Sequence, residues 1–144
     1  MIKVTFYENE KISKDKIDFV VIMAKYNNKW IVVRHQERAT WEIPGGHVEI
    51  NEDIEEAALR ELYEETGAKQ VNKIVPIAIY SVIKEEKETF GQLYYADVKE
   101  LGNLPQSEIA EIKLVDKLPK ALTYPLIQPY LYEKVMNFLM LKSI

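Results

Sequence analysis

The chain has 144 residues, of which 47% are hydrophobic and 29% charged, and these values fit one globular domain over residues 1–144. A formal net charge of −4 argues against a broad basic face for duplex nucleic acid, although cations can screen an acidic site from an anionic substrate. The absence of cysteine excludes disulfides and thiolate metal sites. With no signal-peptide pattern and no long apolar run, we expect a cytoplasmic protein without a membrane segment.

The first third of the chain predicts a β-hairpin. Ile17–Lys25 and Trp30–Arg34 are apolar runs rich in branched residues, and Asn27 and Asn28 between them are typical of a tight turn. The second strand leads toward a Pro-Gly-Gly sequence at residues 44–46.

A helix is predicted after this loop, because the hydrophobic period changes. Asp53 and Glu56 have the spacing of a capping box, with Asp in place of Ser or Thr. Gly67 is placed to end the helix near Thr66.

The remainder of the chain predicts three more strands and a second helix. The strands cover Lys73–Ile83, Gln92–Val98 and Glu111–Val115, with a charged turn at Lys84–Glu88 between the first two. Apolar residues then recur at helical spacing after Pro125: Ile127, Leu131, Val135 and Phe138. Pro129 fits that C-terminal helix only in its first turn. Strands around two separated helices indicate an α/β layered domain with a mixed sheet.

Three glutamates of the first helix share one sector. At 100° per residue, Glu61, Glu64 and Glu65 fall within about 100° of one another. Ala57 and Ala58 lie in the same sector and are small enough to let a ligand approach. The larger apolar residues on the other side are expected to pack on the sheet: Leu59, Leu62 and Tyr63. This pattern predicts a helix with one core face and one acidic face.

Crowded carboxylates of this kind disfavour their ionised forms unless cations neutralise them. Carboxylate oxygens suit Mg²⁺ or Mn²⁺, which would polarise phosphate oxygens and lower the pKa of an attacking water. Arg60 is placed to pair with Glu52, about two turns earlier, and to hold the acidic face in register. An isolated run of this composition is usually a solvated helix face, so a catalytic interpretation depends on the wider spacing.

That wider spacing resembles the Nudix box, Gly-x5-Glu-x7-Arg-Glu-aliphatic-x-Glu-Glu-x-Gly-aliphatic. Residues 46–68 match it at every position except the last, where Ala68 is smaller than the usual aliphatic residue. A looser resemblance extends through the preceding hairpin and the Trp41–Gly46 segment to the later strands.

The resemblance implies a Nudix fold, an α/β/α sandwich with a mixed sheet and a C-terminal helix, and Mg²⁺-dependent attack of water on phosphorus, with Mn²⁺ as a substitute. It implies that Glu61, Glu64 and Glu65 are metal ligands, and Glu61 is also a general base in some members. Gly46 would let the loop turn close to the metal. Arg60 and Glu52 would orient the cluster.

Many similar members add a glutamate from outside the box, just before a late strand. Glu111 occupies such a place as a further metal ligand and catalytic residue, and Glu108 is its rival. An acidic residue that opens an edge strand is commonly just solvated, which is the alternative interpretation.

Substrate-binding candidates lie on the strand and loop that lead into the box. Arg34, His35 and Arg38 could hold a phosphate or read a base, or they could be surface charges. Gly45 and Gly46 would line the same site. Four aromatic residues could stack on a nucleobase, although aromatics in strands more often belong to the core: Trp41, Tyr80, Tyr94 and Tyr95.

The leading functional prediction is a nucleoside triphosphate pyrophosphatase that converts an NTP or dNTP, an oxidised one included, to the monophosphate and pyrophosphate. One alternative is removal of pyrophosphate from the 5′ end of RNA, and another is hydrolysis of a different nucleoside-diphosphate compound. Residues 83–86 lack the Pro or Tyr common in the ADP-ribose and diadenosine polyphosphate subgroups. A nucleotide-sensing domain without turnover is disfavoured, because all box glutamates are retained. A monomer and a homodimer both remain open.

Overall fold

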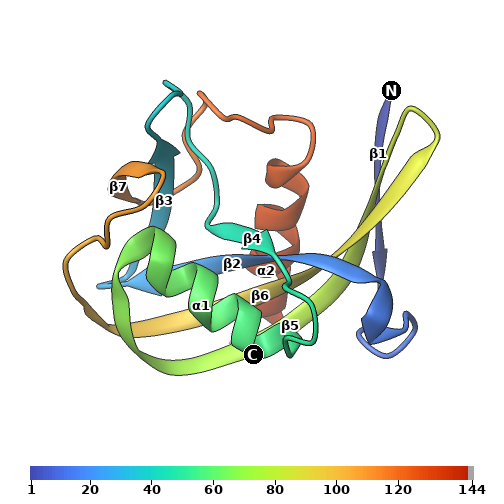
Figure 1. The fold of residues 1–144 in the computed structure, drawn as a ribbon, viewed down its shortest axis with the longest axis horizontal. Coiled ribbons are helices and arrows are strands. Elements are labelled where there is room, and N and C mark those ends of the chain that lie inside the picture. Colours follow the sequence, from blue (N-terminus) through green and yellow to red (C-terminus); the bar gives the residue numbers. More distant parts are fainter. Residues whose placement is uncertain (143–144) are drawn as a thin grey trace.

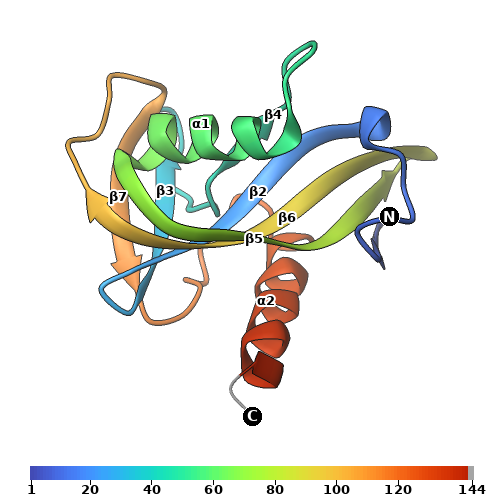
Figure 2. The same ribbon diagram turned by 90° about the horizontal axis from the view of Figure 1, so that it is seen from below.

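One mixed β-sheet carries a helix on each of its faces in the computed structural model, which describes residues 1–142 (Figures 1 and 2). The elements in chain order are β1 Ile2–Tyr7, a 3₁₀ turn Lys14–Lys16, β2 Ile17–Tyr26, β3 Lys29–His35, β4 Gly45–His47, α1 Ile54–Thr66, β5 Ala68–Lys84, β6 Lys87–Leu101, β7 Ile109–Val115 and α2 Gln128–Lys142. The strand order is β1-β5-β6-β2-β3-β7, and β4 pairs with β2. Among the strands of residues 1–142, β2 and β6 are the one pair that runs parallel, and they make the sheet mixed. The predicted α/β fold class is confirmed.

Two tight turns fix the hairpins of the sheet. Asn27 and Asn28 between β2 and β3 both have positive φ, 51° and 65°, as the predicted turn requires. The β5–β6 turn repeats this geometry at Glu85 and Glu86, although glutamate rarely adopts it. Both β5 and β6 are longer than predicted because their polar outer portions continue the ladder from Ala68↔Leu101 to Lys84↔Lys87.

The N-terminal strand was not expected from the sequence. β1 forms one edge of the sheet by pairing antiparallel with the end of β5, from Ile2↔Lys84 to Tyr7↔Ile79. Asn9 follows β1, and its side-chain amide donates to the carbonyl of Pro76 (3.2 Å). Gln92 of β6 in turn donates to Asn9 (3.0 Å), which ties this segment to the sheet.

Helix α1 begins and ends as its capping residues predict. The Asp53 carboxylate accepts hydrogen bonds from the backbone N–H groups of Glu55 (3.2 Å) and Glu56 (3.4 Å). Gly67 adopts φ 80°, and its N–H donates to the carbonyl of Tyr63 (2.8 Å).

The face of α1 that meets the sheet differs from the prediction. Ala57, Ala58 and Leu62 are at most 1% exposed and pack in the core, whereas Leu59 and Tyr63 are 38% and 48% exposed. The two alanines therefore allow close packing on the sheet and do not leave room for a ligand. Because the buried sector also includes Glu65, the core face and the acidic face overlap.

Helix α2 covers the opposite face of the sheet, where Leu131 and Val135 are fully buried (Figure 2). Pro129 lies in the first turn of α2, as predicted, so its missing N–H breaks no helical hydrogen bond. Separate apolar clusters fill the two sides, with Tyr94 on the α1 side and Tyr95 against Trp30 on the α2 side. Within residues 1–142, no helix is both long and apolar enough to cross a bilayer.

Candidate active site

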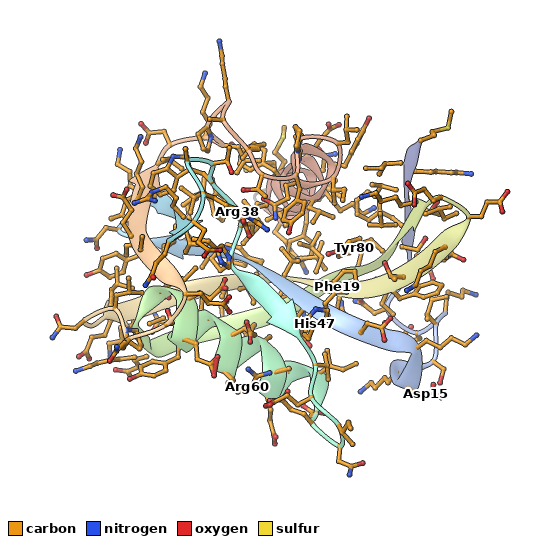
Figure 3. The ribbon with its side chains drawn as sticks, turned by 45° about the horizontal axis from the view of Figure 1, so that its top comes forward. Asp15, Phe19, Arg38, His47, Arg60 and Tyr80 are labelled. Carbon is orange, nitrogen blue, oxygen red and sulfur yellow. The ribbon has the colours of Figure 1, made fainter. Side chains whose placement is uncertain are left out.

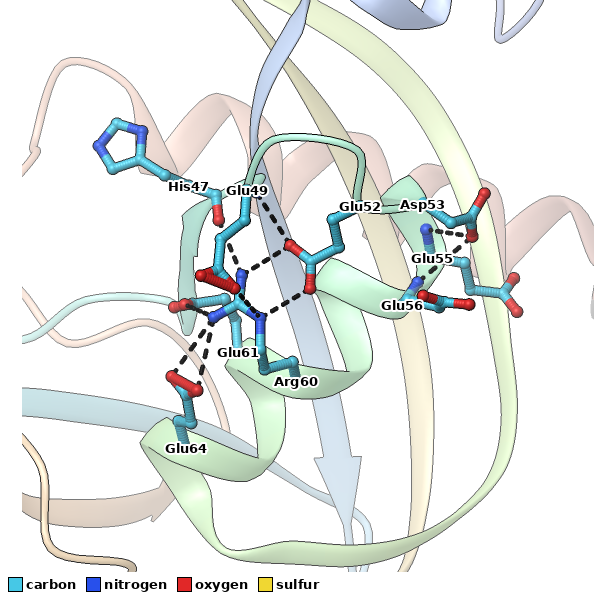
Figure 4. Close-up of polar contacts among 9 residues, drawn as sticks. All are labelled: His47, Glu49, Glu52, Asp53, Glu55, Glu56, Arg60, Glu61 and Glu64. Carbon is cyan, nitrogen blue, oxygen red and sulfur yellow. Dashed lines mark hydrogen bonds and ion pairs between the residues drawn. The ribbon is translucent and has the colours of Figure 1, made fainter.

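Arg60 is the centre of an ion-pair network that holds the loop before α1 against the helix (Figure 4). Its guanidinium donates to both carboxylate oxygens of Glu52, at 2.7 and 2.9 Å. A third N–H donates to Glu61 (2.7 Å), and another donates to the carbonyl of His47 (3.0 Å). Glu49 and Glu64 complete the network, at 3.3 and 3.4 Å from the guanidinium. The bidentate pair with Glu52 and the hydrogen bond to His47 fix the two ends of the loop formed by residues 48–53.

The network stabilises the charged forms of Glu52 and Arg60. The hydrogen bond from Arg60, followed by one from the backbone N–H of Glu49, lowers the pKa of Glu52 to about 2. The hydrogen bond that Arg60 donates to Glu52 is the largest cause that raises the pKa of Arg60, and Glu61 adds to the shift. Glu52 and Arg60 are therefore a permanently ionised pair at neutral pH.

Glu65 is a buried carboxyl group whose pKa is raised above its usual value. Its side chain is 9% exposed, and one oxygen accepts the backbone N–H of Gly45 (3.0 Å). Burial raises its pKa to about 8, opposed by the Gly45 hydrogen bond and assisted by the charges of Glu61, Glu42 and Glu108. In the absence of a cation, Glu65 therefore holds a proton at neutral pH.

Glu61 lies directly against strand β4. A Cβ at Gly46 would overlap the Glu61 carboxylate, so only glycine allows this approach. Burial raises the pKa of Glu61 above its usual value, although the hydrogen bond from Arg60 opposes the shift. Gly45 is equally confined, because a Cβ there would overlap the carbonyl of Val20.

The imidazole of His35, at the C-terminal end of β3, lies within 4 Å of three carboxylates. Its Nε2 is 3.3 Å from Glu42 and 3.9 Å from Glu65, and its Nδ1 is 3.9 Å from Glu108. Arg38 donates to the other oxygen of Glu42 (2.7 Å). His35 and Arg38, both predicted as substrate-binding residues, thus contact the same carboxylate, Glu42.

Glu42 is the member of this cluster that sequence reasoning missed. It is 7% exposed and pairs with Val33 through an isolated β-bridge. A charged residue between Trp41 and Ile43, in a segment that leads into the glycines, was the available signal. Its burial could not be inferred from the sequence, because it depends on how the segment before β4 pairs with β3 and with the β7–α2 connection.

The structure separates the two candidates for a carboxylate outside the box. Glu111 lies opposite Arg34 in the β3–β7 ladder and accepts a hydrogen bond from it (2.9 Å). Glu108, by contrast, acts on Glu61 and Glu65 through its charge and approaches His35. The structure therefore places Glu108 near the carboxylate cluster, and Arg34 and Glu111 in an ion pair of their own.

The chemistry of the cluster fits a hard divalent cation. Glu65 is buried and Glu61 is partly buried, and the raised pKa values of both carboxylates mark a place where positive charge would be stabilising. Among residues 1–142, no three His, Asp or Glu side chains already converge as a set of metal ligands. Arg60 engages Glu61 and Glu64 instead, so these side chains would have to turn toward a cation.

A cavity of about 310 Å³ adjoins the same glycine strand. Three of its lining residues, Phe19, His47 and Tyr80, are labelled in Figure 3. Gly45, Gly46 and His47 form one wall, and residues of the sheet and of the α2 segment form the others, among them Phe19, Tyr80, Tyr124, Ile127 and Gln128. Gln128 is buried, and its Oε1 accepts the N–H of Ile43 (2.8 Å). Of the four predicted stacking residues, only Tyr80 lines this cavity.

Comparison with known proteins points to one family. A family model described as NUDIX domain matches residues 16–131. YtkD of Bacillus subtilis, whose name marks it provisionally as an 8-oxo-dGTP diphosphatase, is 37% identical over 112 residues, which cover 76% of this chain and 68% of that protein.

Solved structures give the same indication. The crystal structure of the Bacillus subtilis pyrophosphohydrolase BsRppH, a glutamate-to-alanine mutant, has a TM-score of 0.78 and 28% identity, and the match covers 93% of this chain and 90% of that one. A MutT NUDIX hydrolase from Burkholderia pseudomallei has a TM-score of 0.65 at 19% identity, over 81% of this chain and 95% of that one, and shares the fold.

Proposed function

The chain belongs to the Nudix family of hydrolases that act on pyrophosphate bonds, and we propose that its substrate is a nucleoside triphosphate, cut to the monophosphate and pyrophosphate. An oxidised deoxynucleoside triphosphate is included in this class, since YtkD is named for one.

The proposal is supported by the position of Gly45 and Gly46 between the helix carboxylates and the cavity. One side of this strand holds the carboxylates of Glu61 and Glu65, and the same glycines line the 310 Å³ cavity. A cavity of this size is at the lower end of those that hold small ligands. A base in the cavity would leave its phosphates beside the carboxylates.

We propose that Glu61, Glu64 and Glu65 hold Mg²⁺, with Mn²⁺ as a substitute. Bound there, the cation would polarise phosphate oxygens and lower the pKa of a water molecule. Arg60 would position the glutamates through its contacts with Glu52 and Glu61. The Gly45 N–H would fix one oxygen of Glu65, so that its other oxygen is free to act.

Glu108 is proposed in place of Glu111 as the carboxylate from outside the box. Its charge already acts on Glu61 and Glu65, and it is linked to Glu65 through His35. A carboxylate in that position can orient a water molecule or accept its proton.

A second candidate substrate is a triphosphate at the 5′ end of RNA. The similarity to BsRppH, which is named a pyrophosphohydrolase, favours release of pyrophosphate from such an end as well, and the match covers 93% of this chain. Both substrates present the same phosphoanhydride to the carboxylates, and they differ in whether further nucleotides are attached to the first nucleoside.

A turnover panel with Mg²⁺ tests the proposal: the common dNTPs, 8-oxo-dGTP, ADP-ribose, a diadenosine polyphosphate and triphosphorylated RNA. We expect pyrophosphate release from one or more nucleoside triphosphates. Turnover confined to ADP-ribose or to the diadenosine compound would contradict it. Binding without any turnover would favour a nucleotide sensor.

A further inference from the structure

Strand β1 ends the sheet with an edge that no other strand of residues 1–142 covers. It pairs with β5 on one side only, at the outer end of the β5–β6 hairpin (Figure 1). The outward N–H and C=O groups of such an edge can pair with a further strand. Lys3 is the one charged residue of β1, which contains neither proline nor glycine. The opposite edge, β7, is better protected, because Glu111 and Lys113 lie on it and its register with β3 shifts.

Apolar side chains continue from β1 onto helix α2. Val4 lies opposite Val82, and both Val82 and Phe6 pack against the apolar cluster on the α2 side of the sheet. The ammonium of Lys134 is 5.1 Å from the ring centroid of Phe6. The side of α2 that carries Lys134 therefore faces β1.

That side of α2 carries apolar residues that the rest of the described chain leaves uncovered. Phe138 and Leu141 follow Lys134 by one and two turns, and Tyr130 precedes it by one turn. Tyr130 and Leu141 are 55% and 73% exposed. The helix projects away from the sheet (Figure 2). Together these side chains form what we call the β1–α2 surface: Val4, Phe6, Tyr130, Phe138 and Leu141.

We propose that the β1–α2 surface is the interface of a two-fold homodimer, in which the β1 strands of two copies pair antiparallel and continue the sheet. The six residues of β1 span about 20 Å. This edge is too short to bury by itself the roughly 800 Å² per partner that a stable interface uses, so the apolar side of α2 completes the contact. A two-fold interface also requires a surface that is complementary to itself.

The sequence of β1 provides this complementarity in one register. With Thr5 on the two-fold axis, Val4 lies opposite Phe6 of the second copy, and Lys3 lies opposite its Tyr7. Apolar side chains then meet each other, and the ammonium meets an aromatic ring. A register centred on Lys3 would place two lysines opposite each other and is disfavoured.

The same register supplies a pair of opposite charges at each end of the strand. Ile2 would lie opposite Glu8 of the second copy, and on its other side Ile2 is paired with Lys84 of β5. Glu8 and Lys84 would share one face of the sheet with their Cα atoms about 10 Å apart, a distance that their long side chains can span. Both residues are exposed, and within residues 1–142 neither forms an ion pair.

Sedimentation velocity of the full chain, from about 1 µM to about 1 mM, measures the association over weak and moderate affinities. We expect a dimer of twice 16.8 kDa at the upper concentrations. Glu8→Lys should weaken the dimer by about tenfold or more, because two lysines would then face each other at each end. The double exchange of Glu8→Lys with Lys84→Glu restores opposite charges and should restore the dimer.

Leu141→Glu tests the part that α2 plays, and it too should weaken the dimer. Met140→Glu is the matched control, because Met140 is 67% exposed on the same turn but points about 100° away, and it should leave the dimer intact. A monomer over the whole concentration range would overturn the inference. So would a dimer that Glu8→Lys leaves unchanged or that the double exchange does not restore, since another face would then join the two copies.

Discussion

Glu65 shows how one residue can serve both core and site. Its carboxylate is buried on the face of α1 that packs on the sheet, held by the Gly45 N–H. A charge there is unfavourable by itself, and the raised pKa of about 8 expresses this cost. A divalent cation would reverse the balance, because the ionised form would gain a partner.

The stability of the metal-free protein should therefore fall as pH rises from about 4.5 to about 8. The folded state keeps the Glu65 proton in this window, whereas the unfolded state releases it, so unfolding becomes easier with each step in pH. Thermal denaturation in EDTA across this range measures the effect. Glu65→Gln should flatten the dependence, and an unchanged profile in that variant would show that Glu65 is not the source.

Glu65→Gln should also lower kcat by a factor of about 10² or more, since a ligand charge is lost with little change in side-chain shape. Steady-state turnover with Mg²⁺ is the measurement. Glu55→Gln is the matched control, because Glu55 is exposed on the same helix outside the cluster. Similar losses in both variants would mean that general acidity, and no local site, supports turnover.

Glu108→Gln should reduce kcat strongly, whereas Glu111→Gln should leave it near the wild-type value. The reason is that Glu108 acts on the buried glutamates through its charge, whereas Glu111 pairs with Arg34 in the β3–β7 ladder. A group acting on the attacking water contributes about 10²- to 10⁴-fold to rate. The reverse order of sensitivity would restore Glu111 as the outer carboxylate.

At the scale of elements, the site depends on contact between β4 and α1. β4 is only three residues long, and it pairs with β2 through Val21↔Gly45 and Phe19↔His47. Its glycines allow the helix carboxylates to reach the backbone. Arg60 adds the second attachment by donating to the carbonyl of His47.

Gly46→Ala should therefore impair activity by displacing Glu61, whose carboxylate occupies the space of the new Cβ. We expect weaker activation by Mg²⁺, seen as a higher metal concentration at half-maximal turnover. Asp53→Ala is a useful comparison because it removes the N-cap of α1 and should cost about 1 kcal/mol of stability without changing the metal requirement. Normal Mg²⁺ activation in Gly46→Ala would contradict the proposed role of this contact.

Local signals in the sequence were sufficient for the boundaries of α1 and for the β2–β3 hairpin. Asp53, Gly67 and the two asparagines act on their immediate neighbours, so their effects can be read from short segments. The orientation of α1 could not be read in this way. The helical wheel grouped Glu65 with the solvent-facing carboxylates, but the Gly45 N–H offers a buried partner that only the folded chain supplies.

At the scale of the molecule, the site combines segments that are distant in sequence. Glu42, Glu65 and Glu108 meet around His35, and Gln128 reaches Ile43 across 85 positions. The Nudix resemblance predicted the box residues because they form one continuous motif. It could not identify Glu42 or the cavity, since both depend on how the loops around β4 cross the α2 segment.

The most direct test of the proposed mechanism is product analysis of nucleoside triphosphate hydrolysis with Mg²⁺ and with excess EDTA. We predict monophosphate and pyrophosphate in equal amounts with Mg²⁺, and no turnover after chelation. Release of orthophosphate and a nucleoside diphosphate would contradict the proposed bond cleavage. Undiminished turnover in EDTA would contradict the role of the carboxylate cluster around Glu61 and Glu65.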